Sequence, residues 1–280
     1  FSFLRAASHP QELLQQADAL GYKALALTDE CSVAGVVRAY QHKKDNDLNI
    51  KLIIGSEFLL KPHQSEAQES LVVLAKNRQG YAQLCQLISL ARRRCEKGKY
   101  QVYGDDFNNL SECLLIWNPD LNSTNELGEK LSSQHKERLW IGCHRRLSAL
   151  DQSLHAHCQT IAKAYDLPIV ALGQVVMHSP DRQMLHDTLT AIRVGMPVHA
   201  CGYALQANRE HSLRPLNKIT KLYPLQWIQA SVTIAQQCNF CLSELSYEYP
   251  AELVPSGYDA NSYLHHLVEQ GKGIRFPAGV

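Results

Sequence analysis

The chain has 280 residues, of which 45% are hydrophobic and 20% are charged, a composition typical of a globular protein with one large domain or two smaller ones. Its 28 Lys and Arg residues against 27 Asp and Glu residues leave a formal net charge of +1, which excludes a general electrostatic attraction to nucleic acid. No apolar run approaches the roughly 18 residues that span a bilayer, and the start FSFLRAASHP lacks the basic and apolar regions of a signal peptide. We therefore predict a cytoplasmic protein without membrane association.

The first elements follow from capping and periodicity. Ser8 is placed to cap a helix that has Pro10 and Glu12 in its first turn and apolar residues at helical spacing after them. Residues 23–28 form a continuous apolar run typical of a buried strand, and residues 32–44 form the next predicted helix.

The same alternation continues along the chain. Further strands are predicted at residues 52–54, 71–74, 113–117, 139–141 and 169–172, and helices at residues 81–94 and 181–194. Strands that are apolar throughout and separated by helices indicate a parallel sheet covered by helices, either an open doubly wound sheet or a closed barrel. After about residue 215 only helices are predicted, at residues 216–222, 225–237 and 260–271, as a second layer or a connector.

Polar residues directly after the strands are the candidates for a site, because parallel sheets bind ligands at the carboxyl ends of their strands. These residues are Asp29, Glu30, Ser56, Glu57, Cys143, His144 and the segment from Gln174 to His178. Asp29, Glu30, Glu57 and His178 offer oxygen and nitrogen ligands for divalent cations that generate hydroxide and hold a phosphate ester. Acidic residues in these places are also common helix caps, so the spacing leaves both interpretations open.

Other motifs give weaker signals. Nine cysteines are an odd number in a chain large enough to stabilise itself, which favours reduced thiols over a disulfide framework. His155 and His157 do not share a helix face, and Cys238 with Cys241 is a lone C-x-x-C, so neither pair predicts a structural zinc site. The basic residues 92–94 are either a phosphate-backbone contact or a solvated helix end. Phosphate-loop, dinucleotide-binding and G-x-S-x-G motifs are absent from the sequence.

Several stretches together resemble a known family. They are FSFLRAASHP at 1–10, ALALTDECSVAGVVRA at 24–39, GSEF at 55–58, LAKNRQGY at 74–81, LTAIRVG at 189–195 and YEYPAELVP at 247–255. In this order they resemble the amino-terminal part of the bacterial error-prone DNA polymerases, relatives of the replicative DNA polymerase III alpha subunit (C-family). The resemblance covers nearly the whole chain and is weakest at about residues 96–164. Both ends of the chain lie in mid-pattern, so we expect a piece of a longer protein.

The resemblance implies an α/β fold of the PHP type, the polymerase and histidinol phosphatase domain, which is a distorted (β/α)7 barrel. Residues 1–215 would form the PHP domain, and residues 216–280 a helical connector toward the polymerase palm, whose Mg-dependent nucleotidyltransferase site would lie outside this chain. The implied parent enzyme performs translesion DNA synthesis, in DNA repair and DNA replication. Its partners would be DNA, met through the parent polymerase, and accessory proteins of translesion synthesis.

The family's metal ligands can be compared with this sequence one by one. The His-x-His of the first strand would lie before Phe1, and the next Asp-His pair is Asp29-Glu30 here. Glu57 matches the family glutamate. Ser70 takes the place of a histidine, and Gln174-Val175-Val176 takes the place of the late Asp-x-His, with His178 kept downstream. Cys143 and His144 align with the remaining ligand region.

These substitutions predict a degenerate cleft, because a neutral amide and an isopropyl group cannot offset the charge of closely spaced divalent ions. We therefore expect a structural and interaction module without a catalytic or metal site and without a cofactor of its own. The alternative is a metal-dependent phosphoesterase or 3′–5′ exonuclease with Zn or Mn at a partial site. It would use Asp29, Glu57, Cys143, His144 and His178, with ligands supplied upstream of Phe1.

Overall fold

The computed structural model describes residues 2–60, 69–123, 125–246 and 254–277. The chain divides into two compact units, Phe1–Glu244 and Leu245–Val280. One of the stretches that resemble the family, at 247–255, lies mostly outside the described residues.

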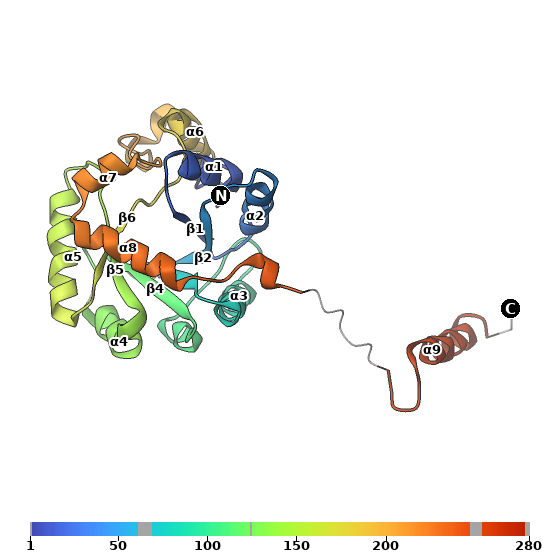
Figure 1. Cartoon of the computed structure of the whole chain (residues 1–280). Helices are drawn as coiled ribbons and strands as arrows, with labels where there is room; N and C mark the ends of the chain where they lie inside the picture. The colour runs from blue at the N-terminus through green and yellow to red at the C-terminus, as the bar shows by residue number, and fades with distance from the viewer. Residues whose placement is uncertain (1, 61–68, 124, 247–253, 278–280) are drawn as a thin grey trace. The chain divides into compact units, whose positions relative to one another are not determined.

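A single curled sheet forms the centre of the first unit (Figure 1). Its six strands follow the chain order: β1 (Ala24–Glu30), β2 (Lys51–Leu59), β3 (Ser70–Ala75), β4 (Cys113–Asn118), β5 (Leu139–His144) and β6 (Ile169–Leu172). The predicted α/β fold and the position of every predicted strand are confirmed.

The expectation of a parallel sheet throughout is wrong at one strand. β1 and β2 are parallel, as are β4, β5 and β6, but β3 runs antiparallel to both β2 and β4. The physical reason lies in the connection, because β2 ends at Leu59 and β3 begins at Ser70. A parallel crossover needs a dozen or more residues, whereas an antiparallel return needs only a short connection.

Five helices cover the outer face of the sheet. They are α1 (Pro10–Ala19), α2 (Val36–Asp45), α3 (Arg78–Arg93), α4 (Asn125–His135) and α5 (Asp151–Tyr165). Leu14 of α1 packs with Leu27 of β1, and Leu84 of α3 packs in the same core as Trp117 of β4. Burial of large apolar side chains, each contributing roughly 1.5–3 kcal/mol, stabilises these contacts.

The inner face of the sheet packs against α8 (Leu225–Gln237), which lies across the curl in Figure 1. Ile234 of α8 and the following Cys238 share a core with Val72, Leu114 and other inner-face residues. The short helix α7 (Leu216–Leu222) precedes α8, and Tyr223 between them donates a hydrogen bond to the carbonyl of Leu172 at the end of β6 (2.8 Å). The first unit therefore continues beyond residue 215, and the predicted division at that residue stays a prediction.

The helix α6 (Gln183–Val194) follows the long segment after β6 and ends at Gly195, whose φ of +76° suits glycine. Its apolar residues are unusually exposed: Met184 is 77% exposed and Ile192 59%. Exposed apolar residues continue along the segment that follows α6, where Tyr203 is fully exposed. Exposed apolar side chains that gather on one surface are typical of an interaction site.

In the second unit, α9 (Ala260–Arg275) begins at Asp259, whose carboxylate accepts a hydrogen bond from the Ser262 N–H (2.8 Å). All nine cysteines are free, as the odd count predicted. Within the described part of the chain, no helix is long and apolar enough to cross a bilayer.

Candidate functional site

The register of β1 and β2 decides which predicted site residues share a face. Glu30 lies opposite Glu57, and Asp29 lies opposite Ser56. Because successive side chains of a strand point to opposite faces, Glu30 and Glu57 lie together on one face, and Asp29 lies on the other. Asp29, Glu30 and Glu57, which the sequence grouped in one candidate site, are therefore divided: Glu30 lies beside Glu57, and Asp29 lies on the opposite face.

Glu57 is held by a chain of side chains that crosses β3 and β4. Ser70 donates a hydrogen bond to Glu57 Oε1 (2.6 Å), and Asn118 Nδ2 donates to Ser70 Oγ (2.9 Å). Burial raises the pKa of Glu57, the Ser70 hydrogen bond lowers it, and the negative charge of Glu30 raises it further. Gly142 of β5 leaves room for Asn118, because a Cβ at this position would lie 2.0 Å from Asn118 Oδ1.

Glu30 is held by residues from distant parts of the chain. Its carboxylate forms an ion pair with Arg5 and accepts a hydrogen bond from the Tyr100 hydroxyl (2.9 Å). Its backbone N–H donates to Ser2 Oγ (2.8 Å), and Ser2 Oγ also donates to Asp29 Oδ1 (3.4 Å). The amino-terminal segment thus covers the end of β1.

At the opposite edge of the sheet from β1, Arg146 follows β5 and Gln174 follows β6. The Arg146 guanidinium donates a hydrogen bond to Gln174 Oε1. Gln174 has a φ of +45°, a left-handed conformation that side chains other than glycine adopt at a cost. The Gln174 side chain therefore binds a guanidinium, in a loop whose backbone is strained.

Two neutral histidines lie near this guanidinium. Burial lowers the pKa of His144 to about 3, and the charge of Arg146 lowers it further. Burial likewise lowers the pKa of His211 to about 4, followed by the charge of Arg146. His211 is 4% exposed and its Nδ1 lies 3.2 Å from the carbonyl oxygen of Gln174, to which it donates a hydrogen bond. The printed contacts form three groups, Arg5 with Glu30, Glu57 with Ser70 and Asn118, and Arg146 with Gln174 and His211. Together with His144, and because their charges act on one another, we name these side chains the polar cluster: Arg5, Glu30, Glu57, Ser70, Asn118, His144, Arg146, Gln174 and His211.

Two predicted site residues have other surroundings. His178 Nδ1 lies 2.8 Å from Ser8 Oγ and 3.8 Å from Glu12 Oε2, so it joins the segment after β6 to the start of α1. Because Ser8 binds His178, it does not cap α1, and the helix cap predicted at Ser8 is wrong. The residue before α1 is His9, whose backbone N–H donates to Glu12 Oε2 (2.8 Å). Cys143 is completely buried in the outer core near Cys158.

The polar cluster does not fit a set of divalent metal ions. In the described parts of the chain, no group of three or more His, Cys, Asp and Glu side chains is arranged to hold a metal. The acidic side chain of Glu30 is paired with a guanidinium, and Gln174 offers an amide oxygen that already accepts from Arg146. Metal clusters need ligands whose negative charge offsets that of the ions. Here the guanidinium groups of Arg5 and Arg146 already bind Glu30 and Gln174, so these side chains are not free to bind metal ions.

The weaker motifs have structural roles. Arg92 donates to the carbonyl of Cys31 (3.1 Å), and Arg94 forms a two-bond ion pair with Asp106, so the basic cluster fastens loops. His155 packs edge-on against Trp227, with ring centroids 4.6 Å apart.

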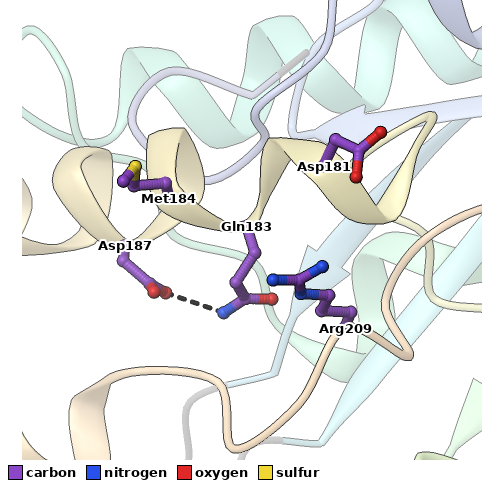
Figure 2. Close-up of a pocket in the computed structure, with 5 residues that line it drawn as sticks. All are labelled: Asp181, Gln183, Met184, Asp187 and Arg209. Atoms are coloured by element: carbon purple, nitrogen blue, oxygen red, sulfur yellow. Dashed lines mark hydrogen bonds between the residues drawn. The ribbon is translucent and has the colours of Figure 1, made fainter.

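A pocket of about 360 Å³ lies beside α6 and is lined by Asp181, Gln183, Met184, Asp187 and Arg209 (Figure 2). Gln183 Nε2 donates a hydrogen bond to Asp187 Oδ1 (2.8 Å), one turn along α6, beside this pocket. None of the predicted site residues lines it.

Sequence reasoning missed the two arginines of the polar cluster. Arg146 lies two residues beyond β5 but five beyond the strand predicted at 139–141, so only a search that admitted cations some way after strands would have found it. Arg5 carries no such signal, because it contacts Glu30 through a segment that precedes α1.

Comparisons with known proteins show which proteins this chain is similar to. A family model described as the PHP domain matches residues 1–162. An error-prone DNA polymerase of Vibrio vulnificus is 50% identical over 281 residues, covering 100% of this chain and 27% of the relative. One of Methylococcus capsulatus is 47% identical, covering 100% of this chain and 26% of the relative. The chain thus spans about a quarter of the length of these relatives.

Among solved structures, a candidate metal-dependent phosphoesterase from Bifidobacterium adolescentis is 13% identical, with a TM-score of 0.43, covering 60% of this chain and 82% of that one.

Proposed function

The chain belongs to the PHP domain family, and from this premise we propose that it is the amino-terminal module of an error-prone DNA polymerase, with an architectural rather than a hydrolytic role. Relatives 44% to 50% identical over the whole chain carry that enzyme's name, which supports the parent function of translesion DNA synthesis. The parent's Mg-dependent nucleotidyl transfer, its DNA and its accessory proteins belong, in this proposal, to the remaining three quarters of such a polymerase. Residues 1–215 act as the PHP domain and residues 216–280 as the connector, in the cytoplasm.

One observation carries the architectural role. In the polar cluster, Glu30 is paired with Arg5, and the side chain after β6 is an amide that accepts from Arg146. Hydrolysis of a phosphate ester by this fold needs ligands that are free to bind divalent ions and to lower the pKa of a bound water. Side chains that already neutralise one another supply structure, since they join the ends of the strands.

The exposed apolar surface of α6 supports the interaction role. Met184 and Ile192 are separated by eight residues, which places them on one side of the helix, and both are largely exposed. We propose that the rest of the polymerase covers this surface, because relatives are nearly four times as long as the chain, at about 27% coverage.

The alternative is a metal-dependent phosphoesterase or exonuclease with Zn or Mn at a partial site. Glu57 is the observation that favours it, because this glutamate matches the family ligand and its Oε1 accepts only a neutral hydroxyl donor among the contacts described above.

The deciding experiment measures manganese- and zinc-dependent hydrolysis of a phosphate monoester and of a DNA 3′ end by the purified chain. We expect no activity above that of a metal-free blank. Glu57→Gln and Asp29→Ala are the matched controls, because they lie on opposite faces of the sheet. Hydrolysis that disappears in Glu57→Gln and survives in Asp29→Ala would establish the phosphoesterase on the inner face.

A further inference from the structure

Arg146 is fixed from three directions. Its backbone N–H donates to both carboxylate oxygens of Asp151 (3.2 and 3.0 Å) at the start of α5. Its carbonyl accepts from Asn208 Nδ2 (2.7 Å). Its partly buried guanidinium donates to Gln174 Oε1, so this one residue joins the end of β5 to the segment after β6 and to the segment before α7.

Arg146 carries a positive charge close enough to the carboxylate of Glu57 to interact with it. Glu30 and Glu57 lie side by side in the register, and Arg5 neutralises Glu30. Burial lowers the pKa of Arg146, and the negative charges of Asp151 first and of Glu57 second oppose that lowering. β2 and β5 are separated by two strands in the sheet, so this interaction spans the curl and not a neighbouring pair.

A guanidinium can replace much of what a bound metal ion does for a structure. It carries a permanent positive charge, and its planar donors can bind oxygens. Among the described residues the Arg146 guanidinium binds one oxygen, Gln174 Oε1, and its backbone makes the other links. It also opposes the binding of a divalent cation nearby, because like charges in a partly buried site repel one another strongly.

We propose that Arg146 is a built-in cation of the polar cluster, which takes the place of a divalent metal ion and keeps such ions out. This inference rests on the proposed architectural function and deepens it, because it names the group that makes the inner face independent of metal. It assigns Arg146 a positioning role, through Gln174 and the segment after β6.

The first test is thermal unfolding of the chain with EDTA and with Mn²⁺ or Zn²⁺. We expect Arg146→Met to lower Tm by roughly 3–10 °C, as loss of a charged hydrogen bond implies, and Arg146→Lys to recover part of this loss by restoring the charge. The matched control is Arg93→Met, which removes an exposed arginine and leaves Tm unchanged. Equal Tm values for wild type and Arg146→Met would overturn the inference. If Arg146→Met does not fold, the test uses Arg146→Lys. A Tm equal to that of wild type in this variant, unchanged by EDTA, Mn²⁺ or Zn²⁺, supports the role of the charge.

The second test measures metal binding by equilibrium dialysis. Gln174→Asp adds a carboxylate beside Arg146, and we expect this variant to bind Mn²⁺ and Zn²⁺ only weakly, because the guanidinium opposes the added cation. In Arg146→Met/Gln174→Asp the opposing charge is gone, and we expect binding at least about tenfold tighter than in Gln174→Asp. Stoichiometric binding by wild type, or equal binding by these two variants, would overturn the inference.

The two failures are distinguishable. Hydrolysis by the wild-type chain would overturn the proposed function. If the wild-type chain is inactive and binds no metal, and the Arg146 substitutions change neither Tm nor metal binding, only the role of Arg146 is overturned.

Discussion

Glu30 and Glu57 lie directly opposite one another on the parallel strands β1 and β2. Two carboxylates in this relation repel one another, and each needs its own compensation. Glu30 has the Arg5 ion pair and the Tyr100 hydroxyl, and Glu57 has the Ser70 hydroxyl. The pair therefore ties the amino-terminal segment, the segment before β4 and the start of β3 to one place in the sheet.

Removal of the Arg5 charge should destabilise the first unit through this pair. We expect Arg5→Met to lower the free energy of unfolding by roughly 0.5–1 kcal/mol, because Arg5 is 44% exposed and its ion pair is screened by solvent. In the Glu30→Gln background the same change should cost less, since the carboxylate is absent. Urea unfolding of the four proteins of this double-mutant cycle measures the difference, and a coupling of zero would contradict the structural importance of the pair.

Acid should destabilise the fold through buried histidines. The pKa of His144 lies at about 3, and those of His211 and His135 at about 4, all below the unfolded value of about 6.5. Because the unfolded chain binds protons first, stability is complete above pH 6.5 and falls as the pH decreases from there toward 4. Each fully buried group contributes up to about 1.4 kcal/mol per pH unit in this window.

Urea unfolding at pH 7, 6 and 5 checks this dependence. His211→Gln should reduce the slope between pH 6.5 and 5, whereas His199→Gln, at an exposed position, should leave it unchanged. Identical slopes for wild type and His211→Gln would mean that the buried imidazole of His211 does not titrate as its surroundings imply.

Gly142→Ala should disturb the polar cluster. The new methyl group would lie 2.0 Å from Asn118 Oδ1 and 2.5 Å from a methyl group of Leu172, so Asn118 must move and its hydrogen bond to Ser70 is weakened. Overpacking of this kind costs roughly 1–3 kcal/mol. Gly271→Ala, in α9 with no heavy atom within 4 Å of the added methyl group, is the control and should leave the main unfolding transition unchanged. A stability of Gly142→Ala equal to wild type would show that Asn118 is not confined.

The α6 surface should matter only where a partner covers it. We expect Met184→Lys/Ile192→Lys to change the stability of the isolated chain by less than about 0.5 kcal/mol, because both residues are exposed. In a full-length polymerase the same double change should lower thermal stability, since a buried contact gains two charges. The control is Val37→Lys, at a 64% exposed apolar residue of α2. Unchanged stability of the full-length double variant would remove α6 from the interface.

Much of the fold follows from local sequence, and the reason is physical. Apolar runs such as 113–117 are fully buried strands, and their burial alone determines that they form the sheet. The direction of β3 does not follow from its own residues, because Leu71 and Val73 pack equally well in either direction. The connection from Leu59 to Ser70 is what requires it, and the strand predicted at 52–54 ended too early to reveal how short that connection is.

The site was less predictable, because it depends on register. Asp29 and Glu30 are adjacent in sequence, and which of them shares a face with Glu57 changes with a shift of one residue in pairing. Arg5 reaches Glu30 over a distance in sequence that no local pattern encodes. Family resemblance pointed to Glu57, Ser70 and Gln174, and the structure connects all three to the polar cluster, through hydroxyl and guanidinium partners.

Because β3 pairs antiparallel with both β2 and β4, two strands together fix its register. Ser70, the first residue of β3, donates to Glu57, and it is paired with Leu59 of β2 on one side and with Asn118 of β4 on the other. A slip of β3 by one residue would present Leu71 or Glu69 where the hydroxyl now lies, and would also break the pairing with both neighbours at once. We therefore expect insertions between β2 and β3 to leave the Ser70 hydroxyl in place, because pairing with both flanking strands fixes the register of β3.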